Sequence, residues 1–304
     1  MSLKDTRIRL MADLLLSPPP RLRGAFLNTY PALRLRLEDV GGREKSAVIQ
    51  SCSMAKALVV ANWKMNPASF KEAKKLFEAI KRAADGAKKS SVVVAAPAVY
   101  LRGLASEYRG KKISFAVQHA HFDAGGAYTG EISLAQAKEA RASYVLIGHA
   151  ERRGMGETND DTQKKVAAAL ALKLTPILCV GEKERKHDGE HFDTVREQLR
   201  VGLAGVAAQK VNRVIITYEP LWTIGAKTAM NPRQMHEMAI FIRKTIVALH
   251  GAVGHSTKIL YGGSIDAGNA GAMLRDGDVR GFLVGRASQN AVEFAALLKA
   301  LENV

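Results

Sequence analysis

Several potentially reactive side chains directly follow short apolar runs in this 304-residue sequence. Asn62 and Lys64 follow the first run, His149 follows the fourth and Glu219 follows the sixth. A carboxylate can abstract a proton, an imidazole can donate a hydrogen bond, and an ammonium group can offset developing negative charge. Each residue taken alone is more often solvated or structural, so its chemistry depends on whether folding brings these groups together. Other polar residues in corresponding positions are Gln118, His119 and Glu182.

The apolar runs predict the strands that would position these side chains. Each run is short, rich in Val and Ile, and apolar throughout instead of alternating with polar residues. This pattern is typical of parallel strands that are buried on both faces. The runs begin at residues 57, 91, 113, 144, 176, 214, 258 and 281.

Most segments between the runs have the periodicity and end signals of helices. Apolar residues from Phe70 to Ala84 recur on one helical face. Capping residues mark where helices begin, and Gly251 marks an expected helix end. The predicted helix starts are Ser69 with Glu72, Ser133 with Gln136 ahead of a helix over 134–142, and Asn231 with Pro232.

Alternating strands and helices predict a single-domain α/β fold, a (β/α)8 barrel over residues 54–304. In such a barrel the C-terminal ends of all strands open onto one mouth, so the polar residues would converge there. A doubly wound open sheet is the structural alternative. That fold would place a glycine fingerprint after the first strand, where the sequence VVANWKMN has none.

Glycines follow the last two runs, as Gly262, Gly263 and Ser264 and then Gly285 and Arg286. Glycine lets backbone N–H groups approach a phosphate closely, and barrels often bind phosphate after strands seven and eight. Ordinary turn formation is the alternative explanation. Because the other polar residues would reach the same mouth, we predict a phosphate-binding site.

Residues 1–53 differ from the rest of the chain. They include three consecutive prolines at 18–20 and no sustained period, so we expect a poorly ordered N-terminal extension. The nine Lys and Arg residues of this segment would suit an organelle-targeting peptide. Transit peptides are poor in acids, however, and this segment has five, so targeting is a weak alternative. A true start at Met54 is a further alternative. The expected location is the cytoplasm.

The composition also constrains the partners. The formal charge is +16, but the basic residues do not interleave with aromatics, which are 6% of the chain. Cys52 and Cys179 are far apart, which fits neither a disulfide framework nor a metal cluster. No apolar run approaches the roughly 20 residues that span a bilayer. We therefore expect no metal, no cofactor, no membrane partner and no nucleic-acid partner.

Eight motifs resemble those of the triosephosphate isomerase family, and they occur in the family's order from Met54 nearly to the C-terminus. A match of this many motifs is specific, although no single motif would be. The motifs are NWKMN (62–66), GAYTGEIS (126–133), IGHAERR (147–153), GETN (156–159), PILCVGE (176–182), YEPLWTIG (218–225), YGGS (261–264) and GFLVGRAS (281–288).

The resemblance implies a glycolytic and gluconeogenic enzyme that interconverts dihydroxyacetone phosphate and D-glyceraldehyde 3-phosphate through an enediolate. Glu219 matches the family's base, His149 its electrophile and Lys64 its stabilising cation, while Asn62 lines the same pocket. The phosphate-binding positions are Gly225, Gly262, Gly263, Ser264, Gly285 and Arg286.

The resemblance also implies supporting contacts and a homodimer. Glu151 should pair near Lys64, Arg243 and Asp278 match a salt bridge, and Tyr261 lies in the YGGS motif. The expected dimer-interface residues are Met65, Thr129 and His119, with Thr129 reaching the neighbouring subunit's site.

Some positions depart from the family pattern. Ala150 replaces the usual Ser after the catalytic His, and His119 replaces an Asn at the start of the dimer loop. The lid expected after Glu219 reads IGAKTAMNP where IGTGKTATP is usual. Arg286 stands where a second Gly is common, and its backbone N–H should still face the phosphate.

Two other functional classes are the alternatives. A sugar-phosphate epimerase would want metal ligands or a second acid at the strand ends, and a Schiff-base lyase would want a Lys where Glu219 stands. A non-catalytic barrel that binds nucleic acid would be consistent with the +16 charge. It would show binding that weakens steeply with salt and no isomerase activity.

Overall fold

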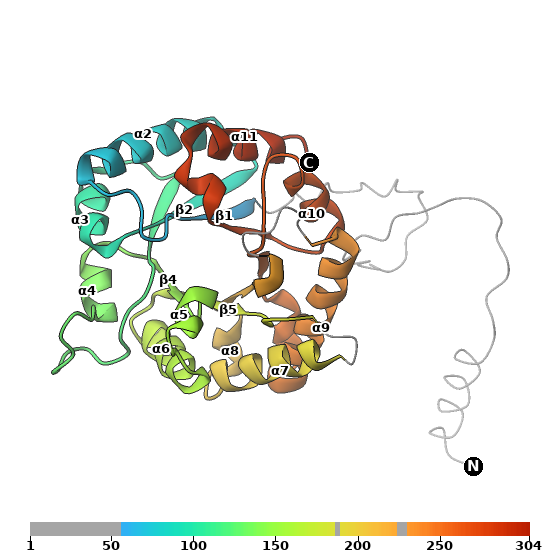
Figure 1. Ribbon diagram of the computed structural model, residues 1–304. Coiled ribbons are helices and arrows are strands. Elements are labelled where there is room, and N and C mark those ends of the chain that lie inside the picture. The colour runs from blue at the N-terminus through green and yellow to red at the C-terminus, as the bar shows by residue number, and fades with distance from the viewer. Residues whose placement is uncertain (1–55, 186–188, 224–229) are drawn as a thin grey trace, which may run out of the picture. The chain divides into compact units, whose positions relative to one another are not determined.

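Eight parallel strands close into a barrel in the computed structural model, which describes residues 56–185, 189–223 and 230–304 (Figure 1). The predicted extension over 1–53 lies outside the described residues. Each strand pairs with the next one along the chain, and the last pairs with the first. This closure confirms the predicted barrel and excludes the open sheet. The strands are β1 (Ala57–Asn62), β2 (Ser90–Ala96), β3 (Ile113–Val117), β4 (Tyr144–Ile147), β5 (Thr175–Val180), β6 (Ile215–Tyr218), β7 (Ile259–Tyr261) and β8 (Gly281–Val284).

The strands are apolar throughout because both of their faces are buried. In β1, Leu58 and Val60 belong to the cluster inside the barrel, whereas Val59 and Ala61 belong to the cluster under the helices. Successive side chains of a strand point to opposite faces, so each strand contributes to both clusters. The barrel is therefore a filled core, and a ligand can enter only at its ends.

Helices surround the barrel on its outer side (Figure 1). The α-helices are α2 (Phe70–Gly86), α3 (Ala98–Glu107), α4 (Leu134–Glu139), α5 (Ala150–Gly154), α6 (Asn159–Ala171), α7 (Glu190–Gly202), α8 (Ala208–Val211), α9 (Pro232–His250), α10 (Ala270–Asp276) and α11 (Ala291–Leu301). Short 3-10 helices are η1 (Leu221–Thr223), η2 (Ala252–Ser256) and η3 (Arg286–Gln289).

The helix signals of the sequence are realised with two differences. At the start of α4, Ser133 and Gln136 form both bonds of a capping box, and Asn231 with Gln234 does the same for α9. At α2 the Ser69 hydroxyl accepts a hydrogen bond from the N–H of Glu72, which makes an N-cap without the reciprocal bond.

The second difference is that α4 ends at Glu139, earlier than the predicted 142. Arg141 adopts a left-handed conformation with φ of 68°, and the N–H of Ala142 reaches back to the carbonyl of Ala137. A left-handed residue cannot continue a right-handed helix, so the last carbonyls are capped there instead.

Candidate active site

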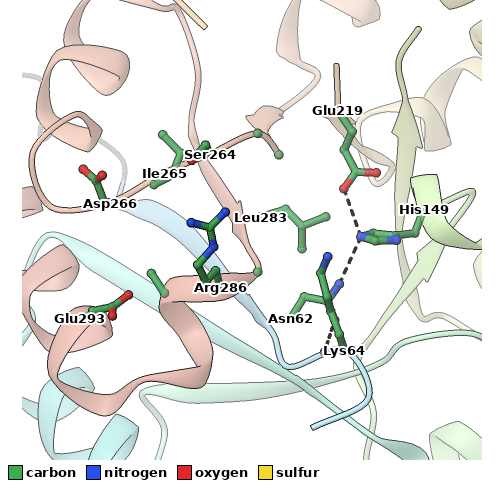
Figure 2. Close-up of a pocket in the computed structure, with 14 residues that line it drawn as sticks. Asn62, Lys64, His149, Glu219, Ser264, Ile265, Asp266, Leu283, Arg286 and Glu293 are labelled. Carbon is green, nitrogen blue, oxygen red and sulfur yellow. Dashed lines mark hydrogen bonds and ion pairs between the residues drawn. The ribbon is translucent and has the colours of Figure 1, made fainter. Parts of the chain in front are cut away.

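A cavity of about 250 Å³ opens at the C-terminal ends of the strands (Figure 2). The predicted catalytic residues converge there from three strands: Asn62 ends β1, with Lys64 two residues further on, His149 follows β4 and Glu219 follows β6. The glycine-rich turns after β7 and β8 complete the wall. The predicted phosphate-binding residues in this wall are Gly262, Gly263, Ser264, Gly285 and Arg286, whereas Gly225 lies outside the described residues.

Glu219 is the buried carboxylate of this cavity, with 2% of its surface exposed. Its Oε2 accepts a hydrogen bond of 3.1 Å from the backbone N–H of Ala150, and its Oε1 lies 3.4 Å from Nε2 of His149. The donor is the backbone N–H of residue 150, so this contact to the base does not depend on the serine hydroxyl that is usual at this position. The carboxylate is thus oriented toward the imidazole by a fixed donor.

The glycine after β7 gives the base its space. A Cβ atom at Gly262 would lie 2.6 Å from Cγ of Glu219 and 2.9 Å from Cγ2 of Thr217. Carbon atoms do not approach this closely without displacement, so a larger residue would push the carboxylate out of place. Part of the glycine signal in the sequence therefore arises from packing around Glu219.

His149 is the N-cap residue of α5, and its ring is held from both sides. Nδ1 accepts a hydrogen bond of 3.3 Å from the N–H of Glu151. A ring nitrogen that accepts carries no proton, so Nε2 is the ring nitrogen left to donate. Nε2 lies toward the cavity, 3.3 Å from Nδ2 of Asn62 and next to Glu219. It is therefore positioned to donate to a substrate oxygen.

Lys64 occupies a strained position at the cavity edge. Its φ is 54°, in the left-handed region that residues with a side chain seldom adopt. The Lys64 N–H donates to Oδ1 of Asn62 at 3.0 Å, and its carbonyl accepts from Nε2 of Gln118 at 2.9 Å. The ammonium group then lies 2.5 Å from Glu151. Gln118, which the sequence marked without assigning a role, helps to hold this conformation by its own amide.

The turn after β7 lines the cavity. Among the described residues, the backbone N–H groups of Gly263 and Ser264 have no protein acceptor. A Cβ at Gly263 would lie 2.1 Å from the hydroxyl of Tyr261, which itself accepts from the N–H of Met230 at 3.1 Å. The close approach of backbone to Tyr261 thus fixes the turn, and the free donors are available to an anion.

Glu182 does not join the cavity, although it is as buried as the base, with 2% of its surface exposed. Its carboxylate accepts hydrogen bonds from the Tyr218 hydroxyl at 2.8 and 2.9 Å and from Nε1 of Trp222 at 2.9 Å. Burial, followed by the nearby Glu182 charge, raises the pKa of Tyr218 well above its ordinary value. This cluster anchors the segment that follows Glu219.

Sequence reasoning missed several residues that line the cavity. Asp266 follows the β7 turn and Glu293 lies in the first turn of α11, so neither directly follows an apolar run. The following loop and helix position these residues, so the ends of the apolar runs do not predict them. The missed lining residues are Ile265, Asp266, Leu283, Ala287 and Glu293.

The predicted supporting residues lie in two places. Glu151 contacts Lys64 at the cavity, as expected from the motif. Arg243 lies instead near the start of β8, where it contacts Asp278 at 3.1 Å and donates to the carbonyls of His255 and Thr257. That ion pair ties α9 to the strand entrances, away from the cavity.

The predicted interface residues lie in or beside loops at the C-terminal ends of β1 and β3. Met65 is 93% exposed and Thr129 is also exposed. His119 contacts Glu131 at 3.1 Å and Arg152 at 3.0 Å. Burial, with the nearby Lys165 and Arg152 charges, lowers the pKa of His119 from its ordinary value.

Across 56–185, 189–223 and 230–304, no group of three or more His, Cys, Asp or Glu residues is arranged to hold a metal ion. In the same ranges no helix is long and apolar enough to cross a membrane.

A closed parallel barrel with a carboxylate, an imidazole and an ammonium group beside glycine-rich turns defines an enzyme of the (β/α)8 barrel class. The family model described as triosephosphate isomerase matches residues 57–301, and the chain belongs to this family.

Curated relatives agree with the family model. The triosephosphate isomerases of Endomicrobium trichonymphae and Clostridium acetobutylicum are each 39% identical to this chain, over 249 and 248 residues, covering 81% of the chain and 99% of the relative. That of Acetivibrio thermocellus is 40% identical over 249 residues, covering 80% of the chain and 98% of the relative.

Proposed function

We propose that Glu219 is the base of an isomerase that interconverts dihydroxyacetone phosphate and D-glyceraldehyde 3-phosphate. Membership of the triosephosphate isomerase family gives the reaction. The observation that carries the residue assignment is the cavity itself, in which Glu219, His149 and Asn62 are linked by contacts of 3.3 to 3.4 Å beside Lys64. Glycine-rich turns line the same cavity, and among the described residues the N–H groups of Gly263 and Ser264 have no protein acceptor.

The chemistry follows from these positions. Glu219 removes a proton from the carbon next to the carbonyl, and negative charge develops on the carbonyl oxygen. Nε2–H of His149 and the Asn62 amide donate to that oxygen, while Lys64 offsets its charge. Glu219 then returns the proton to the neighbouring carbon, and the hydroxyl proton passes between the two oxygens. The product is an isomer, with no atom gained or lost.

Burial makes each of these interactions more effective. Glu219 is 2% and His149 7% exposed, so little water screens the base or the developing oxyanion. Electrostatic interactions are stronger where water is excluded, and donors already in place need no reorganisation during the reaction.

The test is an isomerase assay in deuterated water with purified chain and each triose phosphate. Transfer through a base predicts deuterium at the carbon that receives the proton. In a fraction of turnovers the proton on Glu219 exchanges with solvent before it is returned. Conversion without any deuterium uptake, together with wild-type turnover in Glu219→Gln, would indicate a direct hydride shift and remove the base role. Absence of conversion, with nucleic-acid binding in a gel shift at physiological salt, would favour the non-catalytic alternative.

We further propose that the working form is a homodimer. The support is three exposed large apolar side chains in the segments that follow β1, β3 and β4: Met65, Tyr128 and Met155 are 93%, 44% and 73% exposed. Solvent-exposed apolar side chains of this size favour association. Light scattering should give twice the chain mass, and Met65→Asp should shift the molecule toward monomer. A monomeric wild-type chain at micromolar concentration would contradict the proposal.

A further inference from the structure

The side chain of Arg286 reaches the substrate cavity. Arg286 is the first residue of η3, directly after β8, and it lines the same cavity as Lys64 and Glu219. Figure 2 shows its guanidinium group on the Ser264 side of the cavity, near Ile265 and Leu283. This is the wall that carries the free backbone donors, so the cation and those donors face one region.

No carboxylate neutralises this guanidinium among the described residues. Asp266 and Glu293 line the same cavity, yet neither forms an ion pair with Arg286 within 4.0 Å. Oδ1 of Asp266 instead accepts hydrogen bonds from the backbone N–H groups of Gly268 and Asn269, at 2.8 and 3.1 Å. The donors of Arg286 therefore remain available to a ligand.

The charge balance of the cavity gives this cation a function. Two cations, Lys64 and Arg286, line the cavity with three carboxylates, those of Glu219, Asp266 and Glu293. Lys64 already lies 2.5 Å from the carboxylate of Glu151. Without the guanidinium, the phosphate end would present two rim carboxylates to a dianionic group, and like charges repel.

We propose that the Arg286 side chain binds the phosphate group of the substrate directly, in addition to the backbone N–H groups of the neighbouring turns. This inference rests on the proposed function, whose substrates carry a phosphate dianion. Guanidinium forms planar, charge-assisted pairs with phosphate oxygens, which an ammonium group reproduces only in part. The side chain thus selects phosphorylated substrates and offsets the acidic rim.

The experiment measures phosphate affinity separately from catalysis, in the full chain. Inorganic phosphate is titrated calorimetrically into wild type, Arg286→Gln and Arg286→Lys, and KM for D-glyceraldehyde 3-phosphate is measured in parallel. Arg286→Gln should weaken phosphate binding about tenfold and raise KM by about the same factor, because one charge-assisted contact is lost. Arg286→Lys should recover part of the loss, since it keeps the charge.

Arg280→Gln is the matched control. Arg280 is exposed and precedes β8 at the opposite end of the barrel. The Arg280→Gln variant therefore loses the same charge as Arg286→Gln, but far from the cavity. Its phosphate affinity and KM should stay within about twofold of wild type, because exposed charges beyond a Debye length are screened.

Two outcomes would overturn the proposal: unchanged phosphate affinity in Arg286→Gln, or an equal loss in Arg280→Gln. Thermal unfolding of each variant separates loss of fold from loss of a contact. If the wild-type chain converted no triose phosphate, the proposed function would fail, while the phosphate titration would still decide the role of Arg286.

Discussion

Glu219→Gln isolates proton abstraction from every other property of the cavity. Glutamine has the same shape, and its carbonyl oxygen can still accept the 3.1 Å hydrogen bond from the N–H of Ala150. It cannot remove a proton from carbon. A positioned general base contributes about 100-fold or more, which corresponds to about 2.7 kcal/mol of activation free energy. We therefore expect kcat to fall by at least about 100-fold, and Glu219→Asp should also reach this loss because its carboxylate is retracted.

Although kcat falls, the stability of Glu219→Gln should rise or stay unchanged. Glu219 is 2% exposed and lies next to no Lys or Arg within 4.0 Å among the described residues, so burying its charge opposes folding. Removing that charge while keeping the hydrogen bond should leave the unfolding temperature equal or higher. A large drop in unfolding temperature would show that lost activity reflects lost structure.

The assay couples D-glyceraldehyde 3-phosphate conversion to NADH oxidation through a dihydroxyacetone phosphate reductase. Glu182→Gln is the control, because it makes the same change at an equally buried carboxylate outside the cavity. That variant should lose less than about tenfold in kcat, since Glu182 bonds to Tyr218 and Trp222 and does not line the cavity. Turnover of Glu219→Gln near the wild-type value in purified protein would refute the assignment of the base.

Deleting residues 1–53 should leave kcat/KM unchanged because the family match begins at residue 57, and a truncated chain that fails to fold or dimerise would contradict this. Ala150→Ser should change kcat by less than about threefold, measured in the same assay, because the backbone N–H already holds the base. Gly262→Ala should lower both kcat, by about tenfold or more, and the unfolding temperature, since its Cβ would lie 2.6 Å from Cγ of Glu219. The pKa of His119 is lowered, so just below pH 6.5 the unfolded chain binds more protons than the folded chain, and stability falls as the pH drops through that range. His119→Asn should therefore reduce the loss of unfolding temperature between pH 7.5 and 5.5. An unchanged loss would argue against this role of His119.

Local sequence patterns were sufficient to predict the scaffold. Each strand is buried on both faces, so its residues are apolar throughout and easy to recognise, and all eight runs became strands of one closed barrel. Caps such as Ser133 and Asn231 marked helix starts because they bond to residues only two or three positions away. The end of α4 was placed wrongly, since the left-handed conformation of Arg141 has no strong local signal.

By itself, the sequence determined which elements form, that they close into a barrel and, through its motifs, the family. It placed Glu182 and Glu219 in similar positions after neighbouring strands, and only the motifs singled out Glu219. The tertiary structure decided their environments: Glu219 faces Ala150 and His149, whereas Glu182 bonds to Tyr218 and Trp222. It also brought the Arg286 side chain to the cavity without an acidic partner among the described residues. The physical reason is that strands and caps depend on neighbours within a few residues, whereas the partners of a buried charge come from distant segments.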